Sequence, residues 1–284
     1  MNLFTSKRLP TILALAILMI PSGWVQATDG RLPDCYVLSA GIDNYLHEGK
    51  LSGDLNDARN ATSAFAAQKG RMFNMVYART LLDAQASHAN IMKQMQDFSR
   101  LGKAGDFFVI FLSGHGGNYA NNGGWYFCPY DENPNSTDAD LTSTKILNAA
   151  DVLMKQGKKV VVIVDACFSG NLGKAAEVYL NRYQDPRGGG LILALSSSGS
   201  QESQALGNFS AFAKAFADGL NGAADANRDG HVTLQELKTY SHNRTYELLR
   251  QAKNNARQDS TMLWSRSMSP NTPLAVTVRG RVAR

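Results

Sequence analysis

The chain has 284 residues, of which 44% are hydrophobic and 19% charged, and a formal net charge of +5. This composition supplies enough apolar side chains for a sizeable core. It excludes a disordered or collagen-like chain, and three cysteines are too few for a disulfide scaffold. Removal of Lys7 and Arg8 with the leader described next leaves +3, which is too small and too scattered to predict a nucleic-acid partner.

The first 27 residues have the features of a secretory signal peptide. Lys7 and Arg8 precede the apolar run 11–20, and Val25 and Ala27 place small residues before a cleavage site at Thr28. The run is about half of the ~20 residues that span a bilayer, which favours a cleaved signal over a retained anchor. We therefore expect a secreted or periplasmic protein with no stable membrane insertion after cleavage.

Short β-rich runs alternate with amphipathic helical patterns along the mature chain. In chain order the patterns predict a strand at 35–42, a helix at 54–68, a strand at 73–78, a helix at 87–100, a strand at 106–112, a helix at 141–156, strands at 158–165 and 191–197, and helices at 209–220 and 234–250. This alternation predicts an α/β three-layer sandwich, with a mostly parallel sheet and helices on both faces. Residues 28–252 are predicted to form one domain, and 253–284 a C-terminal tail in which 273–278 could add an edge strand.

Two glycine-rich segments, 116–124 and 171–190, each follow a buried strand and are interpreted as long loops. In open α/β sheets, ligands and chemistry collect at the carboxyl ends of the strands. The second segment contains Lys174, Arg182 and Arg187 among small and polar residues. It could be a linker that the protein cuts itself, or simply a solvated loop.

A histidine and a cysteine follow neighbouring buried strands. The strand at 106–112 continues into Ser-Gly-His115-Gly-Gly, and the strand at 158–165 continues into Ala-Cys167-Phe-Ser-Gly. A thiol is a useful nucleophile only as the thiolate, so it needs a nearby base. A lone histidine is usually solvated and a lone cysteine is usually part of the core. The two motifs together favour a catalytic pair.

These motifs resemble those of the caspase-like cysteine peptidases, in particular the bacterial caspase and metacaspase branch. The resemblance covers roughly residues 35–240 and includes Gly-Ile-Asp-Asn-Tyr45 and Leu-Asn-Asp57-Ala. It implies a caspase-type sheet and peptide-bond hydrolysis without a catalytic cofactor. By the same resemblance His115 is the general base and acid, Cys167 the nucleophile, and the main-chain N–H groups of Gly116 and Cys167 form the oxyanion hole.

Asp57 and Asp165 stand at positions where metacaspase-like enzymes place acidic substrate-binding residues. A pair of carboxylates suits an arginine side chain, whose guanidinium makes directional, charge-assisted hydrogen bonds. Asp57 could instead stabilise a helix start, and Asp165 could accept main-chain hydrogen bonds at a strand end. We favour a pocket for Arg or Lys, and therefore hydrolysis after those residues.

Residues 225–236 match the twelve-residue calcium loop of an EF-hand. The positions that would ligate Ca²⁺ carry Asp225, Asn227, Asp229, His231 through its main-chain carbonyl, Thr233 and Glu236, with Gly230 at the sharp turn. The helix before the loop is predicted to end early, so a paired EF-hand domain is not expected. The loop could bind Ca²⁺ as a stabilising clip or serve only as a turn.

The remaining cysteines, Cys35 and Cys128, could pair in an oxidising compartment, although two separate buried thiols are the safer interpretation. The leading hypothesis for function is an exported cysteine endopeptidase that acts on peptide or protein substrates. The alternatives are a catalytically silent caspase-fold scaffold that binds calcium or a protein partner, and a different thiol hydrolase such as an amidase or transpeptidase.

Overall fold

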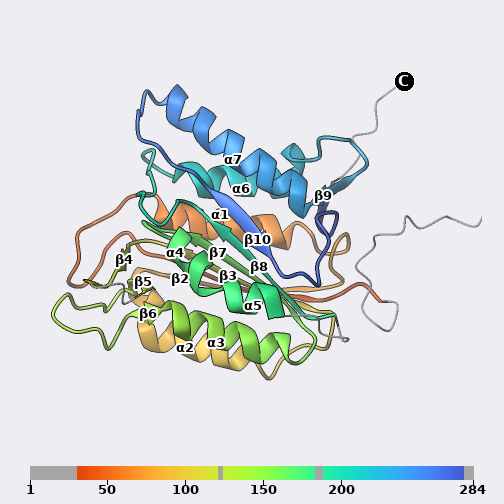
Figure 1. Ribbon diagram of the computed structural model, residues 1–284, viewed down its shortest axis with the longest axis horizontal. Coiled ribbons are helices and arrows are strands. Elements are labelled where there is room, and N and C mark those ends of the chain that lie inside the picture. Colours follow the sequence, from red (N-terminus) through yellow and green to blue (C-terminus); the bar gives the residue numbers. More distant parts are fainter. Residues whose placement is uncertain (1–30, 121–123, 183–187, 278–284) are drawn as a thin grey trace, which may run out of the picture.

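A six-stranded sheet forms the centre of the protein (Figure 1). The computed structural model describes residues 31–120, 124–182 and 188–277, so the predicted signal peptide, 1–27, lies outside the described residues. The strands are β1 (Cys35–Gly41), β2 (Val76–Leu82), β3 (Phe107–Ser113), β7 (Lys159–Asp165), β8 (Gly190–Leu195) and β10 (Thr261–Trp264), in the order β10-β8-β7-β3-β1-β2. All neighbours are parallel except β10, which runs antiparallel to β8.

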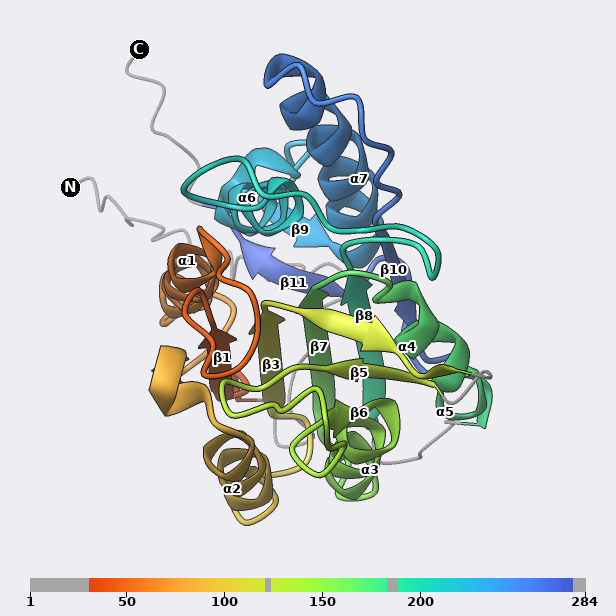
Figure 2. The ribbon, with the colours of Figure 1, turned by 90° about the vertical axis from the view of Figure 1, so that its left-hand side faces the viewer.

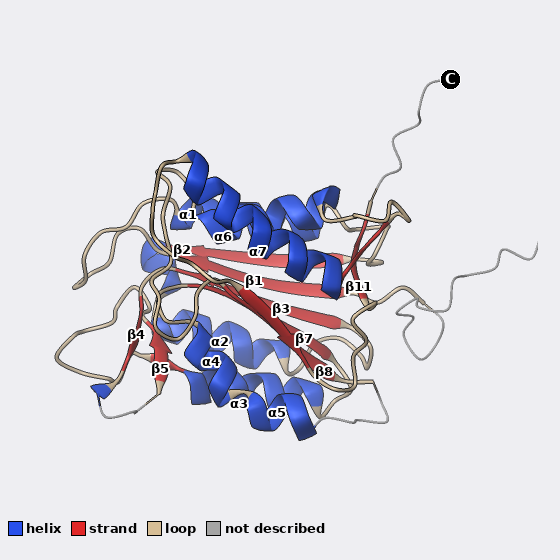
Figure 3. Cartoon of the chain, turned by 45° about the horizontal axis from the view of Figure 1, so that its top comes forward, coloured by secondary structure: helices blue, strands red, loops and turns tan. Residues whose placement is uncertain are grey.

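Helices cover both faces of the sheet (Figure 3). One layer contains α1 (Asp54–Ala66), α6 (Ala211–Asp218) and α7 (Leu234–Gln251), and the other contains α2 (His88–Phe98) and α3 (Ser143–Met154). Val109 of β3 packs in the hydrophobic cluster of the first layer, and its neighbour Ile110 packs in the cluster of the second. Because successive strand residues point to opposite faces, a strand buried on both sides must be apolar throughout. The predicted three-layer α/β fold is confirmed.

Polar side chains start several of these helices. Ser87, Thr142 and Ser210 each accept a hydrogen bond from a main-chain N–H in the first turn of α2, α3 and α6, respectively. Thr233 and Glu236 form a reciprocal capping box at the start of α7. A π-helical turn, η3 (Gly219–Ala223), ends the α6 segment.

Two element predictions need correction. The second strand begins at Val76 rather than at residue 73, because Phe73 is fully buried in a turn where it packs edge-on against Phe107. The predicted loop 171–190 is helical over most of its described part, in α4 (Gly170–Ala175) and α5 (Glu177–Arg182). Leu172 of α4, Leu180 of α5 and Ala176 between the two helices pack into the core, which the residues of a solvated loop would not do.

The C-terminal segment also differs from the prediction. The edge strand of the central sheet is β10, whereas the sequence suggested 273–278 as a possible edge strand. Instead β11 (Pro273–Val276) pairs antiparallel with β9 (His231–Thr233) in a separate two-stranded ribbon. Pairing with β9 places Leu274 and Ala275 in the core under α6 and α7.

A small antiparallel sheet lies across the carboxyl ends of the central strands (Figure 2). It consists of β4 (Gly116–Asn118), β5 (Trp125–Phe127) and β6 (Leu141–Thr142). A short 3₁₀ turn, η1 (Asp83–Ala86), leads from β2 toward α2. Within the described ranges, no helix combines the length and apolar character needed to cross a membrane.

Candidate active site

The register of the central sheet brings His115 and Cys167 to the same edge. Ser113 of β3 pairs with Asp165 of β7, and these are the last residues of the two parallel strands. The N–H of Gly114 also bonds to the carbonyl of Asp165 at 3.1 Å, which extends the alignment one residue further. His115 and Cys167 each follow that aligned pair by two residues, so neighbouring strands deliver both side chains to one rim.

The turn after β7, which carries Cys167, has an unusual backbone conformation. Phe168 has φ of +59°, and its N–H bonds to the carbonyl of Gln201 at 2.8 Å. On the other side of Cys167, the Ser196 hydroxyl accepts a hydrogen bond from the N–H of Ala166 and donates one to the carbonyl of Ala166, each at 3.2 Å. A left-handed conformation at a bulky residue persists only when its surroundings hold it. These contacts therefore fix the turn that carries the thiol.

His115 is oriented by three residues from the segment after β1 and from its own turn. Its Nε2 lies 2.8 Å from the carbonyl oxygen of Gly49. A carbonyl can only accept, so Nε2 carries the proton and Nδ1 is left as the basic nitrogen. The N–H of His115 donates to the hydroxyl of Tyr45 at 2.7 Å, and the Tyr45 ring lies 4.9 Å from the imidazole. Gly114 has φ of +155°, and a Cβ there would lie 2.2 Å from that hydroxyl.

Gly116 presents a free main-chain N–H beside Cys167. In the antiparallel β4–β5 ladder, Cys128 N–H bonds to the carbonyl of His115, so the next pair, Gly116 with Phe127, is a non-hydrogen-bonded pair. The Gly116 N–H therefore points away from β5. A Cβ on Gly116 would lie 3.1 Å from the carbonyl oxygen of Cys167, so no larger residue fits without a shift.

The Cys167 thiol is partly buried, and burial raises its pKa above the ordinary value. The nearby carboxylates of Glu202 and Asp165 raise it further. The thiol is consequently protonated at rest and needs a base to become a nucleophile. The carbonyl oxygen of the same residue accepts a 2.9 Å hydrogen bond from the indole of Trp125, which ties the turn to β5.

Asp57 and Asp165, predicted to line a substrate pocket, converge on Ser210. Oδ2 of Asp57 accepts from the N–H of Ser210 at 2.9 Å, and Oδ2 of Asp165 accepts from its hydroxyl and from the N–H of Ala213. Ser203 donates to the second oxygen of Asp165. Only 1% of Asp57 and 2% of Asp165 is exposed.

One oxygen of this pair has no partner. Oδ1 of Asp57 is buried and accepts no hydrogen bond. Burial, followed by the negative charge of Asp165, raises the pKa of Asp57 well above its usual range. A buried carboxylate without a cation is costly, and a donor that reached Oδ1 would relieve that cost.

Residues 207–210 pack over the start of α1 and close this acidic site. The hydroxyl of Ser52 donates to the carbonyl of Gly207, and the amide of Asn56 donates to the carbonyl of Asn208 at 3.0 Å. Gly53 has φ of +107°, and a Cβ there would lie 2.7 Å from the N–H of Phe209. The segment is thus tied to the helix that carries Asp57.

Sequence reasoning missed several groups at this edge. Asp54 is a third buried carboxylate, with Oδ1 accepting from Ser113 at 2.8 Å, and burial raises its pKa to about 7. Its three-residue spacing from Asp57 on α1 was the available signal. Nothing in the local sequence pointed to the Gly49 carbonyl or the Tyr45 hydroxyl, because only the folded chain brings them to His115.

The caspase domain model matches residues 35–267, which is most of the chain. The chain belongs to the caspase family. Its resemblance to caspase-like cysteine peptidases is thereby confirmed, and peptides or proteins are the substrate class that this family implies. No curated protein shows a significant match to the sequence.

Among solved structures, the caspase domain described here is similar to protein GSU0716 from Geobacter sulfurreducens. The two are 18% identical, with a TM-score of 0.59 over 87% of this chain and 100% of the other. At that identity the likeness supports the fold alone.

In the predicted calcium loop of this caspase domain, several of the candidate ligand side chains accept hydrogen bonds from other residues of the loop. Asp225 accepts at Oδ2 from the N–H of Gly230 and from the hydroxyl of Thr277, while its Oδ1 is buried without a partner. Asn227 accepts from the N–H of Asp229, and Glu236 accepts from the N–H and hydroxyl of Thr233. His231 lies on β9. Across the described ranges, no three His, Cys, Asp or Glu side chains converge closely enough to hold a metal ion.

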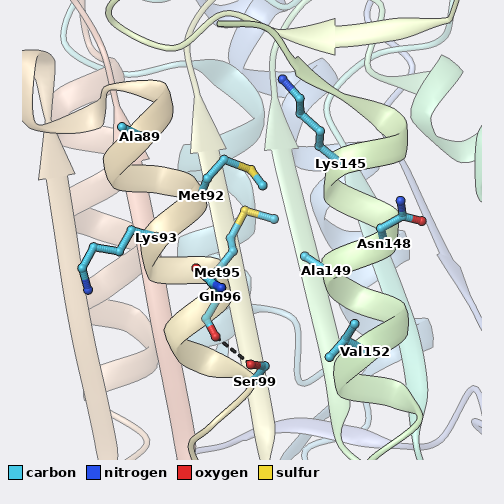
Figure 4. Close-up of a pocket in the computed structure, with 10 residues that line it drawn as sticks. All are labelled: Ala89, Met92, Lys93, Met95, Gln96, Ser99, Lys145, Asn148, Ala149 and Val152. Atoms are coloured by element: carbon cyan, nitrogen blue, oxygen red, sulfur yellow. Dashed lines mark hydrogen bonds between the residues drawn. The ribbon is translucent and has the colours of Figure 1, made fainter. Parts of the chain in front are cut away.

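The other two cysteines do not pair. Cys35 and Cys128 are free and buried, and burial raises the pKa of both thiols. A separate hollow lies between α2 and α3, where Met92, Met95, Ala149 and Val152 contribute apolar walls (Figure 4). Neither His115 nor Cys167 lines it, so it is not the site of the chemistry.

Proposed function

We propose that the protein is an exported cysteine endopeptidase that uses a His115–Cys167 dyad and cleaves after Arg or Lys. The observation that carries this proposal is the shared strand-end register of the two side chains. Family membership supports the general activity. The dyad, the specificity and the export are our own inferences.

In the proposed mechanism, Nδ1 of His115 takes the proton of the Cys167 thiol, and the thiolate attacks the carbonyl carbon of the scissile bond. The N–H groups of Gly116 and Cys167 donate to the oxyanion that forms, an interaction worth a few kcal/mol in the transition state. The imidazolium then protonates the leaving amine, which departs and leaves an acyl-enzyme. His115 finally deprotonates a water that hydrolyses the thioester.

The specificity for Arg or Lys is supported by two buried carboxyl groups, Asp57 and Asp165, whose charged forms a bound cation would stabilise. A guanidinium can donate to both carboxylates and supply the partner that Oδ1 of Asp57 lacks. Because residues 207–210 cover the site, the side chain of the substrate must displace them from the start of α1. Binding of the correct substrate would then complete the active site.

The proposal is tested with coumarin-amide peptides that end in Arg, Lys or Asp, incubated with the mature protein from Thr28. We expect release of coumarin after Arg or Lys, none after Asp, and loss of at least 1,000-fold of the rate in Cys167→Ala and His115→Ala. Cys35→Ala is the matched control, because this thiol lies at the opposite end of the sheet. It should retain the activity.

Three outcomes would overturn the proposal. Cleavage after Asp alone would refute the acidic pocket. No cleavage of any peptide by protein whose Cys167 still reacts with iodoacetamide would favour the silent scaffold. Transfer of the peptide to an added amine would indicate a transpeptidase.

Export is tested separately by expressing the full chain in a two-membrane bacterium. We expect the mature N-terminus at Thr28 and recovery of the protein from the periplasm or medium. Retention of residues 1–27 in the membrane fraction would contradict cleavage.

We further propose that residues 225–236 bind Ca²⁺ as a structural clip, held by Asp225, Asn227, Asp229, Thr233, Glu236 and the carbonyl of His231. The unpartnered buried oxygen of Asp225 supports this, because a hard cation would satisfy it. Millimolar Ca²⁺ should raise Tm by several degrees relative to a chelator, and Asp225→Asn should abolish that difference. Equal Tm values with Ca²⁺ and with chelator would leave the loop as a turn only.

A further inference from the structure

A second acidic hollow lies against His115, on the side away from Asp57. It has a volume of about 390 Å³, and its lining includes His115, Glu48, Glu132, Asp140, Tyr119 and Tyr126. These residues come from the segment after β1 and from the small sheet with its connections. The proposed mechanism uses none of them except His115.

Two buried oxygens in this hollow lack partners. Glu132 is 5% exposed and Asp140 is 2% exposed, yet Oε2 of Glu132 and Oδ1 of Asp140 accept no hydrogen bond. Burial, followed by the negative charge of the nearby Glu48, raises the pKa of Glu132 to about 7. Three carboxyl groups at the wall of one hollow favour a positively charged occupant.

The protein's own nearby cation leaves these oxygens free. The ammonium of Lys145 donates to the main-chain carbonyls of Asp138 and Asp140, at 3.2 and 2.8 Å, and approaches Nε2 of His88. It does not line the hollow. The lysine therefore leaves Oδ1 of Asp140, at the wall of the hollow, without a hydrogen-bond partner.

The aromatic walls favour an organic cation. Tyr119 and Tyr126 stack with ring centroids 4.5 Å apart, and Tyr119 donates to the second oxygen of Asp140. Burial raises the pKa of both phenols, which keeps them neutral. Ring faces attract ammonium and guanidinium groups. The volume suits a long side chain rather than a bare ion.

The two acidic sites lie on opposite sides of the catalytic edge. Asp57 and Ser210 belong to the α1 and α6 layer, whereas Tyr126 and Cys128 pack with the α2 and α3 layer. His115 and Cys167 stand between them at the end of the sheet. A peptide whose Arg or Lys enters the first site and whose scissile bond lies at Cys167 extends past His115 toward the second.

We propose that this hollow binds the ammonium or guanidinium of a substrate residue on the leaving-group side of the cleaved bond. The inference rests on the proposed function and adds a second basic position to its substrate. The protein would then select paired or closely spaced basic residues that flank the scissile bond.

The test uses internally quenched peptides with Arg before the bond and Lys, Arg, Ala or Glu at the first, second or third position after it. We expect kcat/KM at least tenfold higher with Lys or Arg than with Ala at one of these positions, and lower still with Glu. Glu132→Gln should reduce the tenfold preference to less than threefold. A matched control is Asp97→Asn on the surface of α2, which should keep the preference.

A coumarin amide ending in Arg has no residue after the bond, so its cleavage tests the proposed function alone. Asp97→Asn should cleave it at the wild-type rate. If the coumarin amide is cleaved but Lys, Arg and Ala peptides react equally, the second site is refuted while the peptidase stands. If Glu132→Gln does not fold, the half-buried Glu48→Gln replaces it, and an unchanged preference there also overturns the inference.

Discussion

Asp57 is a buried carboxyl group whose protonation affects stability and, in the proposed function, substrate binding. The charged form of Asp57 is disfavoured in the folded protein, so the native state binds a proton that the unfolded chain has already released. The contribution of this proton to the free energy of unfolding is fully present below the ordinary carboxyl pKa of the unfolded chain. It is lost as the pH rises through the raised pKa of Asp57 in the folded protein. The same proton must leave when a guanidinium binds to the carboxylate.

We therefore expect the free energy of unfolding of the wild type to fall between pH 6 and pH 9, and the fall to be smaller in Asp57→Asn. Each pK unit of difference corresponds to about 1.4 kcal/mol, so a change of about 1–3 kcal/mol is measurable by urea denaturation. Parallel pH profiles of the two proteins would show that Asp57 titrates normally. Loss of cleavage after Arg in the same variant would connect the group to the pocket.

Tyr45 acts on His115 only through position. Its hydroxyl accepts the His115 main-chain N–H, and its ring packs beside the imidazole. Replacement by Phe leaves that N–H without an acceptor at a partly buried place, a loss of about 1 kcal/mol.

We expect Tyr45→Phe to lower kcat by about tenfold with little change in KM, because substrate contacts remain while the base is less well oriented. The measurement is steady-state cleavage of the Arg coumarin amide. A purely structural role would lower Tm and leave kcat of the folded protein unchanged.

At the scale of elements, β10 covers the edge of β8. Without β10, β8 would be the outer strand of the parallel sheet. Met262 of β10 is buried in the hydrophobic cluster beneath α6 and α7. The hydroxyl of Ser265 accepts from the N–H of Leu191 and donates to its carbonyl. An uncovered β8 would present a long apolar edge, which favours aggregation.

A chain that ends at residue 252, the predicted domain boundary, should therefore be insoluble or aggregate on purification. A chain that ends at 277 keeps β10 and β11 and serves as the control. Size-exclusion chromatography distinguishes the two. A monomeric 28–252 protein with native activity would show that β10 is dispensable.

The helices α4 and α5 narrow the possible sites of self-cleavage. Lys174 lies within α4, where the chain cannot adopt the extended conformation that peptidases require, whereas Arg182 ends α5. We expect any self-processing cut after Arg182 or Arg187, and none in Cys167→Ala. Intact-mass spectrometry of both proteins checks this. Two fragments from the alanine variant would assign the cut to another protease.

The sequence predicted the elements best where one physical pattern dominated. The predicted strands at 106–112 and 158–165 contain the continuous apolar runs 107–112 and 160–164, and β3 and β7 begin and end within a residue of the predicted bounds. The helices α4 and α5 were missed because glycines at 170 and 173 masked a helical spacing of apolar residues. The role of β10 was missed because four residues carry too short a pattern.

For the whole molecule, the candidate site was predictable where it lies on strand ends and unpredictable where it depends on long-range contacts. His115, Cys167, Asp57 and Asp165 were identified from local motifs. The carboxylates of Glu132 and Asp140 looked like ordinary loop residues, because only the small sheet brings them beside His115. The candidate site thus forms at one end of the sheet from parts of the chain that are far apart in sequence.

The strands β3 and β7 position the proposed catalytic residues, and the separate segment 207–210 closes the acidic site. This separation has a consequence for how the protein can change. In the proposed function, the nucleophile and base are positioned by the β3–β7 register, whereas the acidic pocket is closed by residues 207–210 between β8 and α6. Insertions or exchanges in that segment leave the sheet untouched. Descendants or engineered forms of this protein can therefore change which peptides they accept while inheriting the same reaction.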